Sequence, residues 1–152
     1  MMWVCRPGKH SILYNSVLDT KTIFIGWDGY NYDLHEYNTM TDFKRIVIQE
    51  KQPDARTSIS NWAGQLYSFC CRMKKGDYVL IPAERSKFYT LAIITSDYYF
   101  DSNYKYPHRR KIDIVKETVE KESLCQSTQY SLGAFRTVFV VKQEEEVLNC
   151  CQ

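Results

Sequence analysis

The chain has 152 residues, of which 44% are hydrophobic and 14% aromatic, and its formal net charge is +2. This length and composition predict a single domain, residues 1–152, with a substantial hydrophobic core. A charge this small excludes a global basic field, so any contact with nucleic acid has to come from a local patch.

The sequence lacks the features of membrane, secreted and zinc-binding proteins. It contains no apolar run of about 18 residues, and its N-terminus has no basic segment followed by an apolar core. None of the six cysteines forms a C-x-x-C pair, and the three histidines are scattered. We therefore expect a cytoplasmic protein with reduced cysteines, no membrane contact, no metal and no cofactor.

Strand and helix patterns alternate along the first third of the chain. Strands are predicted over 2–6 and 22–27, with a helix over 10–18 between them. A polar, aromatic loop follows at 27–33. Thr41 or Asp42 is expected to cap a helix that runs to about Lys51 and ends at 52–54.

The most regular pattern spans residues 58–100. Apolar residues recur at helical spacing from Ile59 to Met73, which predicts an amphipathic helix capped by Thr57 or Ser58. Residues 74–77 end this helix, with Gly76 in the left-handed conformation. Two strands, 78–81 and 88–95, are then expected to form a hairpin around the charged loop 83–87.

The last third contains further strands and short helices. We expect a loop at 101–107, a strand at 108–115, a charged and solvated segment at 116–122, a short helix from 123 to 130, a strand at 136–141, and a short helix or tail over the last ~10 residues. Strands and helices alternate without phosphate-binding βαβ loops. This predicts an α+β domain with a curved mixed sheet or small β-barrel flanked by helices.

Four segments carry a resemblance to a known fold. They are 2–8 (MWVCRPG), 23–27 (IFIGW), 74–82 (KKGDYVLIP) and 131–140 (SLGAFRTVFV). In this order they resemble the PUA-like fold of the EVE and YTH type, and are most similar to the N-terminal domain of Mrr-type restriction proteins. The resemblance implies a nucleic-acid recognition domain of a restriction or phage-defence system.

Trp27 stands where a strand gives way to a loop. In YTH and EVE domains an aromatic residue at about this place lines a pocket for a flipped or modified base. Sandwiching a base between aromatic walls stabilises it by roughly 1–3 kcal/mol, and flipping exposes an edge that the duplex hides. A core tryptophan that closes the sheet explains Trp27 equally well.

Trp62 lies near the start of the 58–73 helix, directly after Ser60 and Asn61. EVE domains carry a similar W-x-G-V-R-N-Y stretch, from which this sequence departs because it lacks the arginine and the tyrosine. Asn61 offers a donor and an acceptor to a base edge, and a helix N-terminus favours an anionic or accepting ligand. Trp62 also lies on the apolar stripe, which favours a core position.

Two further groups complete the candidate site. Tyr99 points opposite to its aromatic neighbours in an extended strand, and we assign it to the pocket. The stretch 103–111 (NYKYPHRRK) interleaves tyrosines with cations, which is typical of nucleic-acid binding. We expect the backbone contacts to come from Arg6, Lys9, Lys105, Arg109 and Arg110. A solvated strand edge is the alternative interpretation.

Motifs for a nucleophile elbow, a P-loop, dinucleotide binding or a zinc protease do not occur. We therefore predict a non-catalytic module that binds nucleic acid, DNA rather than RNA, and that works with a separate nuclease or other effector chain. Two alternatives stay open: a sensor of a free nucleotide or another planar ligand, and a protein-interaction domain. A steep salt dependence is expected only for a polymeric ligand.

Overall fold

A computed structural model describes residues 1–51 and 56–151, so the helix end predicted at 52–54 lies outside the described residues. The strands are β1 (Met2–Cys5), β2 (Thr22–Phe24), β3 (Tyr78–Pro82), β4 (Phe88–Ile94), β5 (Tyr99–Phe100), β6 (His108–Glu120) and β7 (Val138–Val140). The helices are α1 (Tyr14–Thr20), α2 (Met40–Lys51), α3 (Arg56–Tyr67), α4 (Gln126–Leu132) and α5 (Glu144–Asn149).

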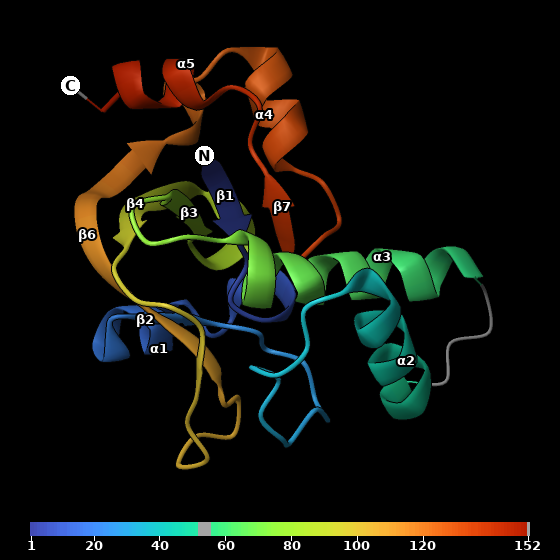
Figure 1. Cartoon of the computed structure of the whole chain (residues 1–152). Helices are drawn as coiled ribbons and strands as arrows, with labels where there is room; N and C mark the ends of the chain where they lie inside the picture. The colour runs from blue at the N-terminus through green and yellow to red at the C-terminus, as the bar shows by residue number, and fades with distance from the viewer. Residues whose placement is uncertain (52–55, 152) are drawn as a thin grey trace.

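The strands form one sheet in the order β2-β6-β4-β3-β1-β7, with β5 paired to β6. Only the β1–β3 pair is parallel among the described strand pairs. The sheet curls into a half-barrel because the first residues of β6 pair with β2 and β5 while its remainder pairs with β4 (Figure 1). Helices α2 and α3 lie to one side and α4 and α5 above the strands. The predicted α+β architecture with a curved, helix-flanked sheet is confirmed.

Several element boundaries differ from the predicted ones. Segment 116–122 was expected to be solvated, but β6 continues to Glu120, because Val119 is buried opposite Tyr89 of β4 while most of its charged neighbours face outward. The first helix begins at Tyr14 rather than at residue 10, since His10 and Ser11 have left-handed backbones in a 3₁₀ turn. Helix α3 begins at Arg56, before the predicted caps, and continues as a π-helical turn at Ser68–Arg72.

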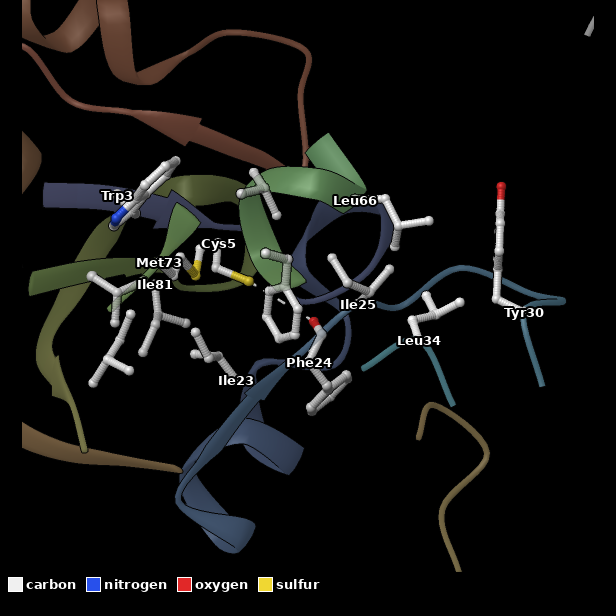
Figure 2. Close-up of a cluster of buried hydrophobic side chains, with 14 of the residues drawn as sticks. Trp3, Cys5, Ile23, Phe24, Ile25, Tyr30, Leu34, Leu66, Met73 and Ile81 are labelled. Carbon is white, nitrogen blue, oxygen red and sulfur yellow. Dashed lines mark hydrogen bonds between the residues drawn. The ribbon is translucent and has the colours of Figure 1, made fainter. Parts of the chain in front are cut away.

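The sheet separates two hydrophobic clusters, and β1 contributes to both. Alternate side chains of a strand point to opposite faces, so Trp3 and Cys5 enter one cluster while Met2 and Val4 enter the other. Figure 2 shows side chains of β1, β2 and α3 converging in the first cluster. Val147 of α5 is buried in the second cluster, so the predicted C-terminal helix or tail is a packed helix. None of the described helices combines the length and the apolarity of a membrane span.

Candidate functional site

The loops after β1 and β2 pack backbone against backbone. A Cβ atom on Gly26 would lie 3.2 Å from the amide nitrogen of Gly8 and 3.3 Å from Cδ1 of Leu13. Gly8 itself has a φ of 76°, which favours glycine. Glycine at both positions allows the two loops to touch, and this contact brings Arg6 and Trp27 to the same place.

A cleft of about 690 Å³ opens where these loops meet α3 and the 133–137 loop that precedes β7. We call it the cleft. Its lining includes Arg6, Gly8, Lys9, Gly26, Trp27, Asn61, Trp62, Gln65, Arg85, Phe135, Arg136 and Thr137. The residues come from five parts of the chain, 6–10, 26–27, 61–65, 85–86 and 133–137, that are adjacent only in the folded protein.

Trp27 and Trp62 form an aromatic corner in the cleft. Their ring centroids are 4.8 Å apart, and the rings are tilted by 39°. The indole Nε1 of Trp27 donates a hydrogen bond of 3.1 Å to Oγ1 of Thr137. Both side chains are half-buried and pack against the core cluster as well as lining the cleft. The core and pocket interpretations therefore each describe one side of these residues.

The two indole rings leave no room for a base between them. A sandwiched base needs walls separated by about 7 Å, twice the stacking distance of roughly 3.4 Å. The rings are closer than that and contact each other. The pair is a platform on which one face of a planar group can stack, so a second aromatic wall has to come from another residue.

Gln65 ties α3 to the loop that precedes β7. Its Oε1 accepts hydrogen bonds from the backbone N–H groups of Thr137 (2.7 Å) and Val138 (3.1 Å). Its Nε2 donates to Oδ1 of Asn61 at 3.1 Å. Because this bond uses the oxygen of the exposed Asn61 amide, the N–H₂ group is the donor that this residue of the cleft lining can offer a ligand.

Arg6 shapes the same loop from the other side. Its Nη1 donates to the carbonyl oxygens of Ala134 (3.0 Å) and Arg136 (2.6 Å). Partial burial lowers the pKa of the Arg6 guanidinium. The loop held in this way leaves Phe135 completely exposed, with a relative accessibility of 103%, and Arg136 exposed beside it.

The cleft carries positive charge without compensation. Arg6, Lys9, Arg85 and Arg136 line it, whereas no aspartate or glutamate does. None of these four cations forms an ion pair with a carboxylate in the part of the chain that the structure describes. A concave surface of one sign concentrates the field and attracts anions even in a nearly neutral protein.

The structure brings together five of the residues predicted for the site: Arg6, Lys9, Trp27, Asn61 and Trp62. Ser60 instead lines a neighbouring hollow. Tyr99 pairs with Arg109 across β5 and β6, and Lys105 lies over the Tyr106 ring at 5.3 Å. Neither residue lines the cleft. The loop between β5 and β6, which carries Lys105, projects at the bottom of Figure 1, away from α3 and β7.

Arg109 and Arg110 are buried, each 3% exposed, so the structure corrects their assignment to phosphates. The Arg109 guanidinium lies 3.6 Å from the Tyr104 ring centroid and 4.4 Å from that of Phe24. Arg110 donates to the carbonyl oxygens of Phe69 (2.8 Å), Cys70 (3.2 Å) and Ser96 (3.3 Å). Burial lowers the pKa of both guanidinium groups. Their hydrogen bonds hold the scaffold together.

His108, which precedes them, is the centre of a buried hydrogen-bond chain. The Leu34 N–H donates to Oη of Tyr98 (3.1 Å), and this hydroxyl lies 2.6 Å from Nδ1 of His108. Nε2 of His108 lies 2.6 Å from the carbonyl oxygen of Tyr30. Burial lowers the pKa of His108, which favours a neutral ring that accepts at Nδ1 and donates at Nε2. The Tyr30 ring lies 6.1 Å from that of Trp27, so the chain supports the loop that carries Trp27.

Sequence reasoning missed Gln65, Arg85, Phe135, Arg136 and Thr137. Residues 136 and 137 were assigned to a strand, but β7 begins at Val138, so they lie in the loop. The signal that was available is the sequence Gly133-Ala134-Phe135-Arg136, an aromatic residue and a cation two and three positions after a glycine. Among the described residues, no group of three or more His, Cys, Asp or Glu side chains could hold a metal ion.

A family model described as "Domain of unknown function (DUF8426)" matches residues 3–139. No curated protein matches the sequence. Among solved structures, the chain is similar to the YTH domain of the Zygosaccharomyces rouxii MRB1 protein, crystallised in complex with N6-methyladenosine RNA. That match has a TM-score of 0.50 and 12% identity, and it covers 99% of this chain and 86% of that chain. The fold is therefore YTH-like, as the resemblance implied.

Proposed function

The chain belongs to the family described as "Domain of unknown function (DUF8426)", and from the geometry of its cleft we propose that it is a non-catalytic module that binds nucleic acid and recognises a modified base. The observation that carries this proposal is the Trp27–Trp62 platform inside a cleft with four cations and no carboxylate. Aromatic surfaces for bases next to cations for phosphates are the two elements that nucleic-acid binding requires.

Each part of the cleft has a role in this proposal. The base stacks on the indole platform, and the Asn61 N–H₂ group donates to an acceptor on the base edge. Phe135, exposed on the same cleft, covers the outer face of the base. Lys9, Arg85 and Arg136 contact the phosphates. Arg6 acts mainly by holding the loop that presents Phe135 and Arg136.

A methylated base fits this environment better than its unmodified form. A methyl group on the base edge adds apolar area, and covering it with an indole ring stabilises the complex by about 0.8 kcal/mol. The crystal structure of the similar YTH domain contains N6-methyladenosine RNA, which makes N6-methyladenine the first base to test. The preference for DNA, a partner effector chain and a role in restriction or phage defence stay predictions of the Mrr-type resemblance.

The test is a fluorescence-anisotropy titration with single-stranded oligonucleotides of about nine nucleotides. The set pairs RNA and DNA, each with adenine or N6-methyladenine at the centre. We expect the methylated form to bind more tightly. Trp27→Leu and Trp62→Leu should each lower affinity by roughly 10- to 100-fold and abolish the preference, because each removes a stacking surface.

Tyr99→Leu is the matched control, since it removes an aromatic ring that lies outside the cleft. It should leave both affinity and preference unchanged. Melting curves identify variants that bind weakly because they are unfolded. Equal effects of Tyr99→Leu and of the folded tryptophan variants would refute the base platform.

A further inference from the structure

A second hollow, of about 740 Å³, adjoins the cleft along α3. We call it the second hollow. It runs between α3 with its π-helical turn and strand β7, two elements that contact each other. It shares Asn61, Gln65, Ala134 and Arg136 with the cleft, so the two depressions are contiguous. Its volume is within the range of roughly 300–1,000 Å³ that is typical of ligand sites.

The lining of the second hollow has the chemistry of an anion site. Arg72, Arg136 and Lys142 are exposed on it, and no carboxylate lines it. None of the three forms an ion pair with a carboxylate among residues 1–51 and 56–151. Ser60 adds an exposed hydroxyl group that can donate to phosphate or sugar oxygens. The buried Ser68 hydroxyl accepts from Nη1 of Arg72 at 3.4 Å.

Gly64 keeps the helical wall of the second hollow flat. It lies inside α3, where glycine costs about 1 kcal/mol relative to alanine. A Cβ atom built on it would meet nothing within 4 Å, so packing does not explain the glycine. Bare helix backbone at this point allows a ligand to approach closely.

We propose that the second hollow holds the sugar-phosphate backbone of the nucleotides that flank the base bound in the cleft. The strand crosses Arg136, which lies on the boundary between the two depressions, and continues past Gly64 to Arg72 and Lys142. The proposal rests on the proposed function and extends it. The preferred ligand is a strand that fills both depressions, rather than a free nucleotide.

The experiment compares two ligands over a series of salt concentrations: N6-methyladenosine alone, and the methylated oligonucleotide of about nine nucleotides. In Arg72→Gln/Lys142→Gln, we expect oligonucleotide affinity to fall roughly 10-fold at about 0.1 M salt. The slope of log K against log salt should shrink by about 1.4, because each single-strand phosphate contact contributes about 0.7. Binding of the nucleoside should not change.

The matched control is Lys44→Gln/Arg45→Gln, which removes the same charge from exposed positions of α2 outside both depressions. A second variant, Gly64→Leu, blocks the hollow without removing any contact, and it should weaken only the oligonucleotide. Gly64→Ala adds the Cβ atom alone and should weaken the oligonucleotide by a smaller factor. An equal loss in the α2 control, or an unchanged slope in Arg72→Gln/Lys142→Gln, would overturn the proposal.

Failure of the base platform gives a different pattern. If methylated and plain oligonucleotides bind equally, the proposed base recognition is wrong. The difference in slope between Arg72→Gln/Lys142→Gln and the α2 control still decides whether the backbone occupies the second hollow.

Discussion

Arg136 and Arg110 both belong to segments that combine cations with aromatic residues, yet their guanidinium groups lie in opposite environments. Arg136 is exposed between two depressions and has no carboxylate partner in the described chain. Arg110 is 3% exposed and donates to three backbone carbonyl groups. The first segment, 133–137, lines the cleft, and the second, 104–111, lies within the scaffold.

The difference shows what decides the role of a basic and aromatic segment. A guanidinium group whose donors are already used by protein carbonyls, and which is removed from water, has little left to offer a phosphate. An exposed guanidinium group without an ion-pair partner has its charge and its N–H donors available to a ligand. The two segments are also connected, because the His108 hydrogen-bond chain supports the Tyr30 backbone next to Trp27.

The largest expected effect is on stability and comes from Arg110→Met. Methionine preserves the apolar stem but leaves the carbonyl groups of Phe69, Cys70 and Ser96 without this donor. Losing several charged hydrogen bonds at a buried site should lower the free energy of unfolding by about 3 kcal/mol. For a chain of this size the melting temperature should fall by roughly 6–12 °C, measured by calorimetry.

The neighbouring cation provides the control for this prediction. Lys111 is exposed, so Lys111→Met should change the free energy of unfolding by about 0.5 kcal/mol or less. Equal destabilisation by the two substitutions would show that the charge of the segment matters and its buried hydrogen bonds do not.

A second difference between the regions is their response to pH. Burial lowers the pKa of His108 in the folded state, against smaller opposing effects of the hydrogen bond to the Tyr30 carbonyl and of the Asp33 charge. The unfolded chain therefore binds more protons below about pH 6.5, and stability falls as the pH drops below that value. The free energy of unfolding should change by at most about 1.4 kcal/mol per pH unit from this group.

The measurement is urea unfolding between about pH 7.5 and 5, with His108→Gln as the reference. Glutamine does not titrate, yet it offers an acceptor to Tyr98 and a donor to the Tyr30 carbonyl. The wild-type curve should converge toward the variant curve as the pH falls. Parallel curves would assign the pH dependence to other groups.

Arg136→Gln tests whether the exposed Arg136 binds phosphate without contributing to stability. Stability should change by about 0.5 kcal/mol or less, because the side chain is exposed. Oligonucleotide affinity should fall roughly fivefold, and the salt slope should shrink by about 0.7, since one phosphate contact is lost. Arg136→Lys retains the charge and should restore the slope. A loss of stability without a change in slope would place Arg136 in the scaffold instead.

Much of the architecture was predictable because its determinants are local. The hairpin of β3 and β4, the helix over 56–72 and the turn at Gly76 follow from apolar periodicity and from one glycine with a φ of 93°. Trp27 and Trp62 were also selected as candidate site residues from their local sequence. The hydrogen bond between Trp27 and Thr137 could not be predicted in this way, because the two residues are 110 positions apart in the sequence.

The burial of Arg109 and Arg110 could not be predicted for a related reason. Their donors are satisfied by carbonyl and hydroxyl groups of β2, of the 96–106 region and of the π-helical turn after α3. A run of cations gives no indication of such partners, and it is normally a solvated surface. Only the curl of β6 brings these elements together around the two guanidinium groups.

The smallest expected effect comes from Tyr104, whose ring lies 3.6 Å from the Arg109 guanidinium carbon and is itself 41% exposed. Tyr104→Leu should lower the free energy of unfolding by about 0.5–1 kcal/mol through loss of this cation–π contact. Tyr104→Phe should retain stability, because it keeps the ring. Arg109 stays bound to Thr22 at 2.7 Å in either case, which limits the loss.

Because Tyr104 is partly exposed beside a cation, it is also the residue of the 104–111 segment best placed to contact a base. Neither variant should change oligonucleotide affinity if this segment belongs to the scaffold. A loss of affinity at unchanged stability would make 104–111 a second binding surface and remove the distinction between the two regions.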